Sequence, residues 1–279
     1  MAEVRAHERG DTGISVNPQD AYPPAQVAHL VEQVGVRKAR LPVRSTLVLG
    51  LLAGAFIAFG GMYFTLVMTG SGLGFGPARL LGGVAFSLGL VLVIVGGAEL
   101  FTGNTLIVMA WADRKITTLE LLRNWLLVYI ANFVGAFGCA LMVIWSGALG
   151  LGDGAVMSTA IAIGEAKATL GFVEAFFRGV LCNTLVCLAI WLCFAAHSVS
   201  SKILAIVLPI SAFVALGFEH SVANMYLMPV AMMAGAEGIG VAGLVGNLLP
   251  VTLGNIVGGG VFVALVYWLV YLADEKKPG

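Results

Sequence analysis

The sequence predicts an all-α membrane protein with six transmembrane helices, arranged as two inverted three-helix repeats in which the second and fifth helices are broken. Composition is the first observation: 59% of the 279 residues are hydrophobic and 11% are charged, whereas a soluble domain has about 25% charged residues. Fifteen basic and fifteen acidic residues cancel, so nucleic acid is not expected as a partner. The other two observations are the apolar runs and a duplicated motif.

The apolar runs predict the spans. A transmembrane helix needs about 20 predominantly apolar residues, and six runs reach that length. Two of them are overlong and contain an interruption, and these are the second and the fifth. The expected spans are residues 46–69, 79–111, 119–148, 171–196, 203–234 and 247–272.

Basic residues predict the orientation of these spans. One side holds the N-terminal flank, the turn at 113–115, Lys202 and the lysines of the tail, whereas the loops of the other side hold only Arg79 and Lys167. Loops rich in Lys and Arg face the cytoplasm. We therefore expect a multi-pass protein of the bacterial cytoplasmic (inner) membrane with both termini in the cytoplasm, which requires an even number of spans.

The start of the chain is polar and lacks the apolar central region of a signal peptide. After Pro23-Pro24, residues 25–41 carry apolar side chains at helical spacing and then basic ones, which predicts an amphipathic helix. It lies either on the membrane surface or on the protein's own loops. The expected organisation is a cytoplasmic segment over 1–44, a six-helix transmembrane domain over 45–273 with repeats at about 45–150 and 166–273, and a cytoplasmic tail over 274–279.

A duplicated motif lies in the two interrupted runs. GAELFTGN, with Glu99 and Asn104, matches GFEHSVAN, with Glu219 and Asn224, as G-x-E-x4-N. The span that follows each copy adds a second match, NFVG and NIVG. Because each half contains an odd number of spans, the two halves insert with opposite orientation. Broken helices at matching positions of inverted repeats are the best sequence indication of a membrane transport site.

The residues at these breaks suggest different roles. A broken helix frees backbone N–H groups, and we expect Glu99 and Glu219 to cap them rather than to bind ions, because both repeats carry them. The repeats differ where Leu100 corresponds to His220. Histidine titrates near neutral pH and donates to anions, and we favour this role for His220 over that of a satisfied core residue.

Other chemistry finds little support in the sequence. Four cysteines lie in apolar stretches without C-x-x-C spacing, and only four histidines accompany them. Neither a metal site, a disulfide frame nor a cofactor is indicated, and the cysteines are expected to be small buried hydrophobes. One buried histidine and two symmetric glutamates provide no nucleophile with its base, so an enzyme is not expected.

Four motifs taken together resemble the formate/nitrite transporter family. They are GGAELFTGN, RGVLCNTLVCLAIW, GFEHSVANMY and PVTLGNIVGGG, and the resemblance extends from about residue 21 to 272. It implies an aquaporin-like hourglass protomer, a homopentamer with one pore in each subunit, and small monovalent anions as substrates. A water or glycerol channel is a more distant alternative, because its breaks carry Asn-Pro-Ala where this chain has TGN and VAN.

The resemblance also implies roles for individual residues. His220 matches the central pore histidine, and Thr102 matches the threonine of the loop that breaks the second helix. Asn255 matches an asparagine bonded near that histidine. The remaining matches are the vestibule Asn183, the outer Lys167 and the apolar constrictions Phe86, Leu90, Leu100 and Phe213.

Substrate identity within the family stays open at this point. The lead over residues 20–41 resembles formate-type members, and formate is the favoured substrate. The short loop GAEGIGVAG departs from the formate branch, whereas FTGN and the absence of histidines after Lys167 resemble the nitrite branch. Nitrite and hydrosulfide are therefore the alternatives. Proton-coupled transport, in which His220 transfers a proton, and a passive channel, in which it only donates a hydrogen bond, are both compatible with the sequence.

Overall fold

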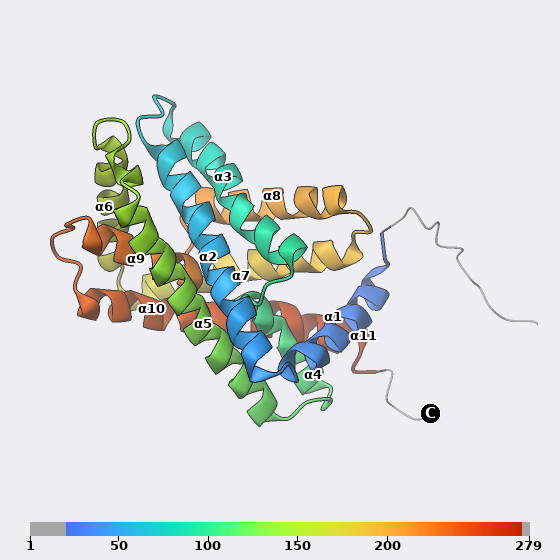
Figure 1. Ribbon diagram of the computed structural model, residues 1–279. Helices are drawn as coiled ribbons and strands as arrows, with labels where there is room; N and C mark the ends of the chain where they lie inside the picture. The colour runs from blue at the N-terminus through green and yellow to red at the C-terminus, as the bar shows by residue number, and fades with distance from the viewer. Residues whose placement is uncertain (1–20, 275–279) are drawn as a thin grey trace, which may run out of the picture.

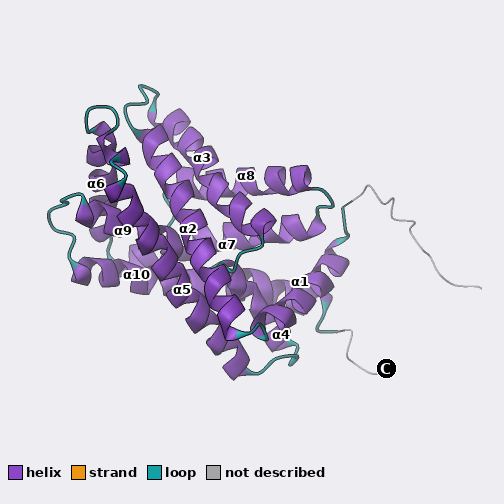
Figure 2. Cartoon of the chain, in the orientation of Figure 1, coloured by secondary structure: helices purple, strands orange, loops and turns teal. Residues whose placement is uncertain are grey.

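Helices make up the computed structural model, which describes residues 21–274, and no strand occurs in these residues (Figure 2). The first half of the chain begins with a short helix that precedes three long ones. Its elements are α1 (Pro24–Ala39), α2 (Val43–Met68), α3 (Phe75–Gly96), the 3-10 helix η1 (Gly103–Ile107), α4 (Val108–Ala112) and α5 (Thr118–Trp145).

The second half repeats this order. A short helix again precedes the long ones, and a long helix is again followed by an interrupted one. The elements are the 3-10 turn η2 (Ala148–Gly150), α6 (Ala155–Ala168), α7 (Phe172–Ala195), α8 (Val199–Ala215), α9 (Ser221–Met233), α10 (Val241–Ile256), the π-helical η3 (Val257–Leu265) and α11 (Val266–Tyr271).

Five helices of the described chain are long and apolar enough to cross a membrane: α2, α3, α5, α7 and the continuous stretch Val241–Tyr271. The fifth predicted span consists of two shorter apolar helices, α8 and α9, which meet at the second break. The architecture agrees with the predicted six spans. In Figure 1, α2, α3 and α5 run obliquely across α7, α8 and α10, so the helices of one repeat cross those of the other.

Both breaks begin at a glycine in the left-handed region. Gly97 has φ 79° and follows α3, and Gly217 has φ 73° and follows α8. In each case the next residue donates its N–H five residues back, from Ala98 to the Val93 carbonyl and from Phe218 to the Phe213 carbonyl. Glycine is favoured there because a Cβ is strained at positive φ. The first residue of the duplicated motif therefore ends the helix.

The remaining glycines of interest allow close packing of long helices. A Cβ on Gly54 would lie 2.1 Å from the Asn132 carbonyl oxygen, and one on Gly258 would lie 2.2 Å from that of Val180. At these distances a Cβ would clash with the carbonyl oxygen, so a residue larger than glycine would force the two helices apart. Small residues at these positions let α2 approach α5 and let η3 approach α7 closely.

The helix α1 packs on the protein itself. Val27, Val31 and Gly35 are buried, and α1 contacts η1, α4 and α7. A Cβ on Gly35 would lie 3.3 Å from that of Ala110 in α4. Of the two positions that the sequence left open, the structure shows packing on the protein's own elements. Figure 1 shows α1 and α6 at opposite ends of the molecule, and we use them to name its two sides.

The helix α6 was not predicted from the sequence. Its 14 residues have moderate hydropathy, and its first residue follows a run of glycines that includes Gly152 and Gly154. It stands before α7 as α1 stands before α2. The repeat that the sequence placed at about 45–150 and 166–273 therefore extends to include a short helix in each half.

Candidate functional site

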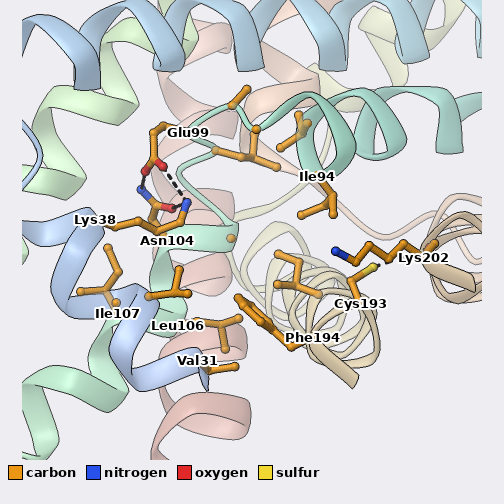
Figure 3. Close-up of a pocket in the computed structure, with 18 residues that line it drawn as sticks. Val31, Lys38, Ile94, Glu99, Asn104, Leu106, Ile107, Cys193, Phe194 and Lys202 are labelled. Carbon is orange, nitrogen blue, oxygen red and sulfur yellow. Dashed lines mark hydrogen bonds and ion pairs between the residues drawn. The ribbon is translucent and has the colours of Figure 1, made fainter. Parts of the chain in front are cut away.

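Glu99, in the first break, forms an ion pair with the end of α1. Lys38 Nζ lies 2.8 Å from Glu99 Oε1, and Asn104 Nδ2 donates to Glu99 Oε2 at 2.7 Å. Asn104 Nδ2 also donates to Asn124 Oδ1 at 3.0 Å, and Asn124 Nδ2 donates to the Lys38 carbonyl at 3.0 Å. These four residues, the first tetrad, close a ring that ties α1 and α5 to the break. Figure 3 shows Lys38, Glu99 and Asn104 of this ring.

The second break carries the same ring. Lys167 Nζ, near the end of α6, lies 2.8 Å from Glu219 Oε1, and Asn224 Nδ2 donates to Glu219 Oε2 at 2.6 Å. Asn224 Nδ2 donates to Asn247 Oδ1 at 2.7 Å, and Asn247 Nδ2 donates to the Lys167 carbonyl at 2.9 Å. These four residues, the second tetrad, repeat the four contacts described for the first, which is direct structural evidence for the inverted repeat. The first tetrad has one further bond, from Lys38 Nζ to Asn104 Oδ1 at 3.0 Å, which has no counterpart in the second.

The expectation that the glutamates cap backbone N–H groups is wrong. Both carboxylates bond to lysine and asparagine side chains. The freed backbone N–H groups instead donate to asparagine side chains of the span that follows each break. Asn132 Oδ1 accepts from Phe101 N–H and Asn255 Oδ1 accepts from Ser221 N–H, each at 2.9 Å. An amide that reaches in from a neighbouring helix also donates, so it satisfies the freed backbone in both senses.

The N–H groups of the same two side-chain amides bond backbone carbonyls in each break. Asn132 Nδ2 bonds the Glu99 carbonyl at 2.9 Å, and Asn255 Nδ2 bonds the Glu219 carbonyl at 3.0 Å. Asn255 thus hydrogen-bonds Glu219 and Ser221, the two residues that flank His220 in the chain. Because these amides are fully buried, we assign them to the framework of the pathway.

The two breaks differ at His220, which joins them. His220 Nε2 lies 3.0 Å from Thr102 Oγ1 of the first break. Its other nitrogen, Nδ1, accepts the backbone N–H of Ala223 at 3.1 Å and so caps α9. A backbone N–H is an obligatory donor, which identifies Nδ1 as the unprotonated nitrogen. His220 is therefore a neutral ring whose Nε2–H donates to Thr102.

The side chains predicted to form the apolar constrictions are buried, and two of them, Phe213 and Phe86, lie on the His220 side. Phe86, Leu90, Leu100 and Phe213 are all at most 4% exposed. The rings of Phe86 and Phe213 meet edge to face at 5.7 Å, and the ring of Phe213 stacks on that of His220 at 6.0 Å with 18° between their planes. The structure thus brings His220 together with Phe213 and Phe86 on its α6 side.

Cavities lie on both sides of these residues. The α1-side cavity, about 250 Å³, is lined by residues of α1, the first break and α7, including Lys38, Glu99 and Leu100 (Figure 3). The α6-side cavity, about 330 Å³, is lined by Lys167, Glu219 and His220 together with Phe86 and Phe213. Leu100 therefore lines the α1-side cavity, Phe86 and Phe213 line the α6-side cavity, and Leu90 lines neither.

Asn183 lies elsewhere than predicted. It is fully buried and belongs to neither cavity lining. Its Nδ2 donates to the carbonyl oxygens of Thr102 at 3.2 Å and Asn255 at 2.7 Å and to Thr105 Oγ1 at 3.1 Å. The expectation of a vestibule residue is replaced by a buried amide behind Thr102, which holds the first break against α10.

Sequence reasoning missed several charged and polar residues of these vestibules. Lys38 and the two tetrad residues Asn124 and Asn247 had no assigned role. The signal for the asparagines is present: each lies eight residues before the Asn of NFVG or NIVG. Lys202 lines the α1-side cavity, and Figure 3 shows its side chain reaching toward that cavity. Arg79 and Arg178 line the α6-side cavity.

Comparison with known proteins decides the family. The formate/nitrite transporter family profile matches residues 25–269, nearly the whole described chain. The chain belongs to the formate/nitrite transporter family. It is accordingly a membrane transport protein and not an enzyme, and the predicted hourglass-type fold of inverted repeats is confirmed by the solved structures that resemble it.

Individual members of the family resemble the chain along most of its length. The formate channel FocA of Escherichia coli (strain K12) is 39% identical, over 93% of this chain and 98% of that one. A probable formate transporter of Methanothermobacter thermautotrophicus is 40% identical, over 90% and 97%. A solved pentameric formate channel with formate bound superposes with TM-score 0.75 at 38% identity, covering 82% of this chain and 98% of that one.

Proposed function

We propose that this member of the formate/nitrite transporter family is a homopentameric anion channel of the bacterial cytoplasmic membrane, with formate as its main substrate and one pore in each subunit. The observation that carries the proposal is the contact between His220 Nε2 and Thr102 Oγ1, enclosed by apolar residues between two cavities with basic linings. The names of its relatives, which include formate channels and a pentameric formate channel, support the substrate and the assembly.

Excess positive charge in both cavities supports anions as the substrates. The charged residues that line the α1-side cavity are Lys38, Glu99 and Lys202. Because Lys38 and Glu99 pair, Lys202 remains as the excess charge. The α6-side cavity is lined by three basic residues and one glutamate. A cavity lined by one sign of charge concentrates the opposite ion. Such linings give a neutral solute such as glycerol no advantage.

The constriction selects among anions by dehydration and by donors. An anion that passes the apolar rings loses water, and the loss is costly unless donors replace it. Thr102 accepts from His220 Nε2–H, so its own hydroxyl hydrogen is free to donate to the anion. A hydrogen bond received by the threonine polarises the one that it gives. The N-terminus of α9, which starts at Ser221, adds a favourable dipole.

His220 is proposed to donate a hydrogen bond without transferring a proton. Proton donation requires an imidazolium ring, in which both nitrogens carry hydrogen. Nδ1 accepts a hydrogen bond from the N–H of Ala223 at 3.1 Å. Protonation of Nδ1 would place two N–H donors opposite each other, and the repulsion would break the N-cap of α9. The bond that Nδ1 accepts from Ala223 supports a neutral ring. This favours a passive anion channel over proton-coupled transport.

The proposed orientation places α1 in the cytoplasm and α6 on the opposite side. The α1 side carries the basic turn at 113–115 and Lys202 in addition to the end of α1. The excess of Lys and Arg on cytoplasmic loops fits this assignment. The lysines of the tail, Lys276 and Lys277, lie outside the described residues. The lipid bilayer then surrounds the exposed apolar faces of α2, α5 and α7, which carry many exposed Leu, Val and Phe side chains.

Flux through proteoliposomes tests the proposal. Purified protein is reconstituted, and uptake of labelled formate is compared with that of nitrite and hydrosulfide, with and without a pH gradient. We expect formate to pass fastest, without dependence on the gradient. Faster nitrite or hydrosulfide would assign the alternative substrate of the same pore. Equal permeation of glycerol and formate would contradict an anion channel, and liposomes without protein measure the leak through lipid.

A further inference from the structure

Arg79 and Arg178 converge in the α6-side cavity. Arg79 comes from the start of α3 and Arg178 from α7, and both line the cavity above Phe86 and Phe213. A Cβ on Gly217 would lie 3.4 Å from Arg79 Nη2 and 3.6 Å from Arg178 Nη1. Two guanidinium groups therefore approach the same point, and the positive φ of Gly217 keeps that point free of a side chain.

Backbone carbonyls hold both guanidinium groups in place. Arg79 donates from Nη2 to the Val214 carbonyl at 2.6 Å and from Nε to that of Ala215 at 3.3 Å. Arg178 donates from Nη1 to the Gly217 carbonyl at 3.1 Å. These carbonyls lie at the C-terminal end of α8, whose dipole is favourable for cations. The loop that ends α8 thus allows two like charges to stand close together.

Donors remain on each guanidinium group. An arginine has five N–H groups in a planar fork. Among the described residues, Arg79 uses two donor nitrogens for its carbonyls and Arg178 uses Nη1 for a carbonyl and Nη2 for Glu174 Oε1, at 2.5 Å. No carboxylate of the described chain pairs with Arg79. If the two arginines served only to cap the C-terminal end of α8, neither a second arginine nor unused N–H donors would be required.

We propose that Arg79 and Arg178 form an outer binding site for planar oxyanions, that is, carboxylates such as formate and the similarly planar nitrite. The proposal rests on the proposed function, because the conducted anion would bind at this site before it reaches the constriction at Phe86 and Phe213. Arginine forks match the two oxygens of a planar oxyanion, whereas hydrosulfide, with a single sulfur, gains no second bond. The site therefore contributes discrimination between substrates in addition to attraction.

Glu174 takes part as an internal competitor. Its carboxylate occupies Arg178 Nη2 within one turn of α7, and both side chains are partly exposed, 51% for Glu174 and 39% for Arg178. An exposed pair of this kind is weak, so an incoming anion displaces it readily. Removal of the Glu174 charge is expected to strengthen anion binding, which is opposite in sign to the removal of Arg178.

The test measures initial flux against concentration in proteoliposomes with the anion added on the α6 side. We expect Arg178→Gln to raise the half-saturating formate concentration by about threefold or more, with no matching change for hydrosulfide. Arg178→Lys keeps the charge but loses the fork, and we expect it to remain weakened for formate. Glu174→Gln should lower the half-saturating concentration. The matched control is Arg123→Gln, because Arg123 also bonds carbonyls, those of Ala39 and Leu41, and lines neither cavity.

The outcomes separate this inference from the proposed function. Full recovery of formate saturation in Arg178→Lys, or equal changes for formate and hydrosulfide, would reduce the site to a point charge and overturn it. An unchanged formate curve in both Arg178→Gln and Glu174→Gln would do the same. If the wild-type protein conducts no formate or nitrite at all, the proposed function itself fails. Glu174→Gln leaves every bond of the α8 end intact, so it stays informative if Arg178→Gln does not assemble.

Discussion

Thr102 Oγ1 and His220 Nε2 lie 3.0 Å apart, although the two residues belong to opposite halves of an inverted repeat and are separated by 118 positions. Around them the repeats are alike: each break has its tetrad and its backbone-bonding asparagine. The symmetric parts hold the backbone of the breaks. Within the two duplicated motifs, His220 is a titratable side chain that has an apolar counterpart, Leu100, and it lies where the two halves meet. The proposed selection of anions depends on it.

Two substitutions separate the roles of the His220 nitrogens. Asparagine is a strong N-cap residue, so His220→Asn should keep the bond that Nδ1 now accepts from Ala223 and lose only the Nε2 donor. We expect near-normal thermal stability and at least tenfold slower formate flux. His220→Phe should lose both functions, with stability lower by about 1 kcal/mol. Fast formate flux through His220→Asn would show that the Nε2–H is dispensable.

The second tetrad should contribute mainly to stability. Glu219 and Lys167 are 5% and 14% exposed in their side chains, and removal of one partner of a buried pair costs about 3–5 kcal/mol. We expect Glu219→Ala to lower the unfolding temperature of the detergent-solubilised oligomer strongly. Lys167→Met added to it should restore part of the loss, because it removes the unpaired charge. Thermal melts of the four proteins of this cycle give the coupling. A stable Glu219→Ala oligomer with altered selectivity would contradict the assignment.

Lys202 should attract anions from the α1 side. It lines the α1-side cavity, and no carboxylate of the described chain bonds to it, whereas Lys38 and Lys167 are both paired with glutamates. We expect Lys202→Ala to lower flux from that side at low formate concentration only. Raised ionic strength should reproduce the effect in the wild-type protein, because screening limits the reach of a charge to about 8 Å at physiological salt. Equal flux in both proteins at low concentration and low salt would exclude this role.

The docking of α1 should tighten as pH falls. Burial raises the pKa of the Glu32 carboxyl, and its hydrogen bond to Asp113 raises it further, despite the ion pair with Lys115. The docked helix therefore binds this proton more tightly than the released helix does. Between the ordinary carboxyl pKa and the raised one, protonation favours the docked state, and this stabilisation is lost as pH rises.

Hydrogen exchange in α1 measures this effect. We expect the protection of Pro24–Ala39 to be greater at acidic than at alkaline pH in the wild-type protein. Glu32→Gln should remove most of the difference and stay docked, because the amide is neutral at every pH. Val36→Ala serves as a control on the same helix, since Val36 only packs against the core. A pH difference of equal size in Glu32→Gln would place the titrating group elsewhere.

Much of the fold could be predicted because short sequence motifs identify the internal repeat. G-x-E-x4-N placed both breaks, since a glycine at positive φ must end a helix at that point. The difference between Leu100 and His220 identified the titratable position at which the two copies differ, although Thr102 and Val222 differ in polarity as well. Hydropathy gave the spans because a bilayer demands a minimum length of apolar helix. The fifth span was interpreted correctly from its interruption, although neither α8 nor α9 has the full length of a span.

The sequence did not reveal which atoms satisfy the breaks. Lys38 and Glu99 are 61 positions apart and share no motif with each other, and α1 and α6 have dissimilar sequences. A lysine's role depends on the tertiary position of its ammonium group. The correspondence between Lys38 and Lys167 could therefore not be predicted from the sequence. For the same reason, the backbone N–H groups were assigned to the nearby glutamates, whereas Asn132 and Asn255 reach them from another helix.

The central claim is that a neutral His220 donates a hydrogen bond while the substrate crosses as an anion, and electrophysiology of the reconstituted channel tests it most directly. Formate gradients are imposed across a planar bilayer at equal pH on both sides, and the reversal potential of the current is recorded. The account predicts an electrogenic current that reverses at the formate equilibrium potential and does not shift with an added pH gradient. Electroneutral formate movement that brings one proton with each anion would contradict it.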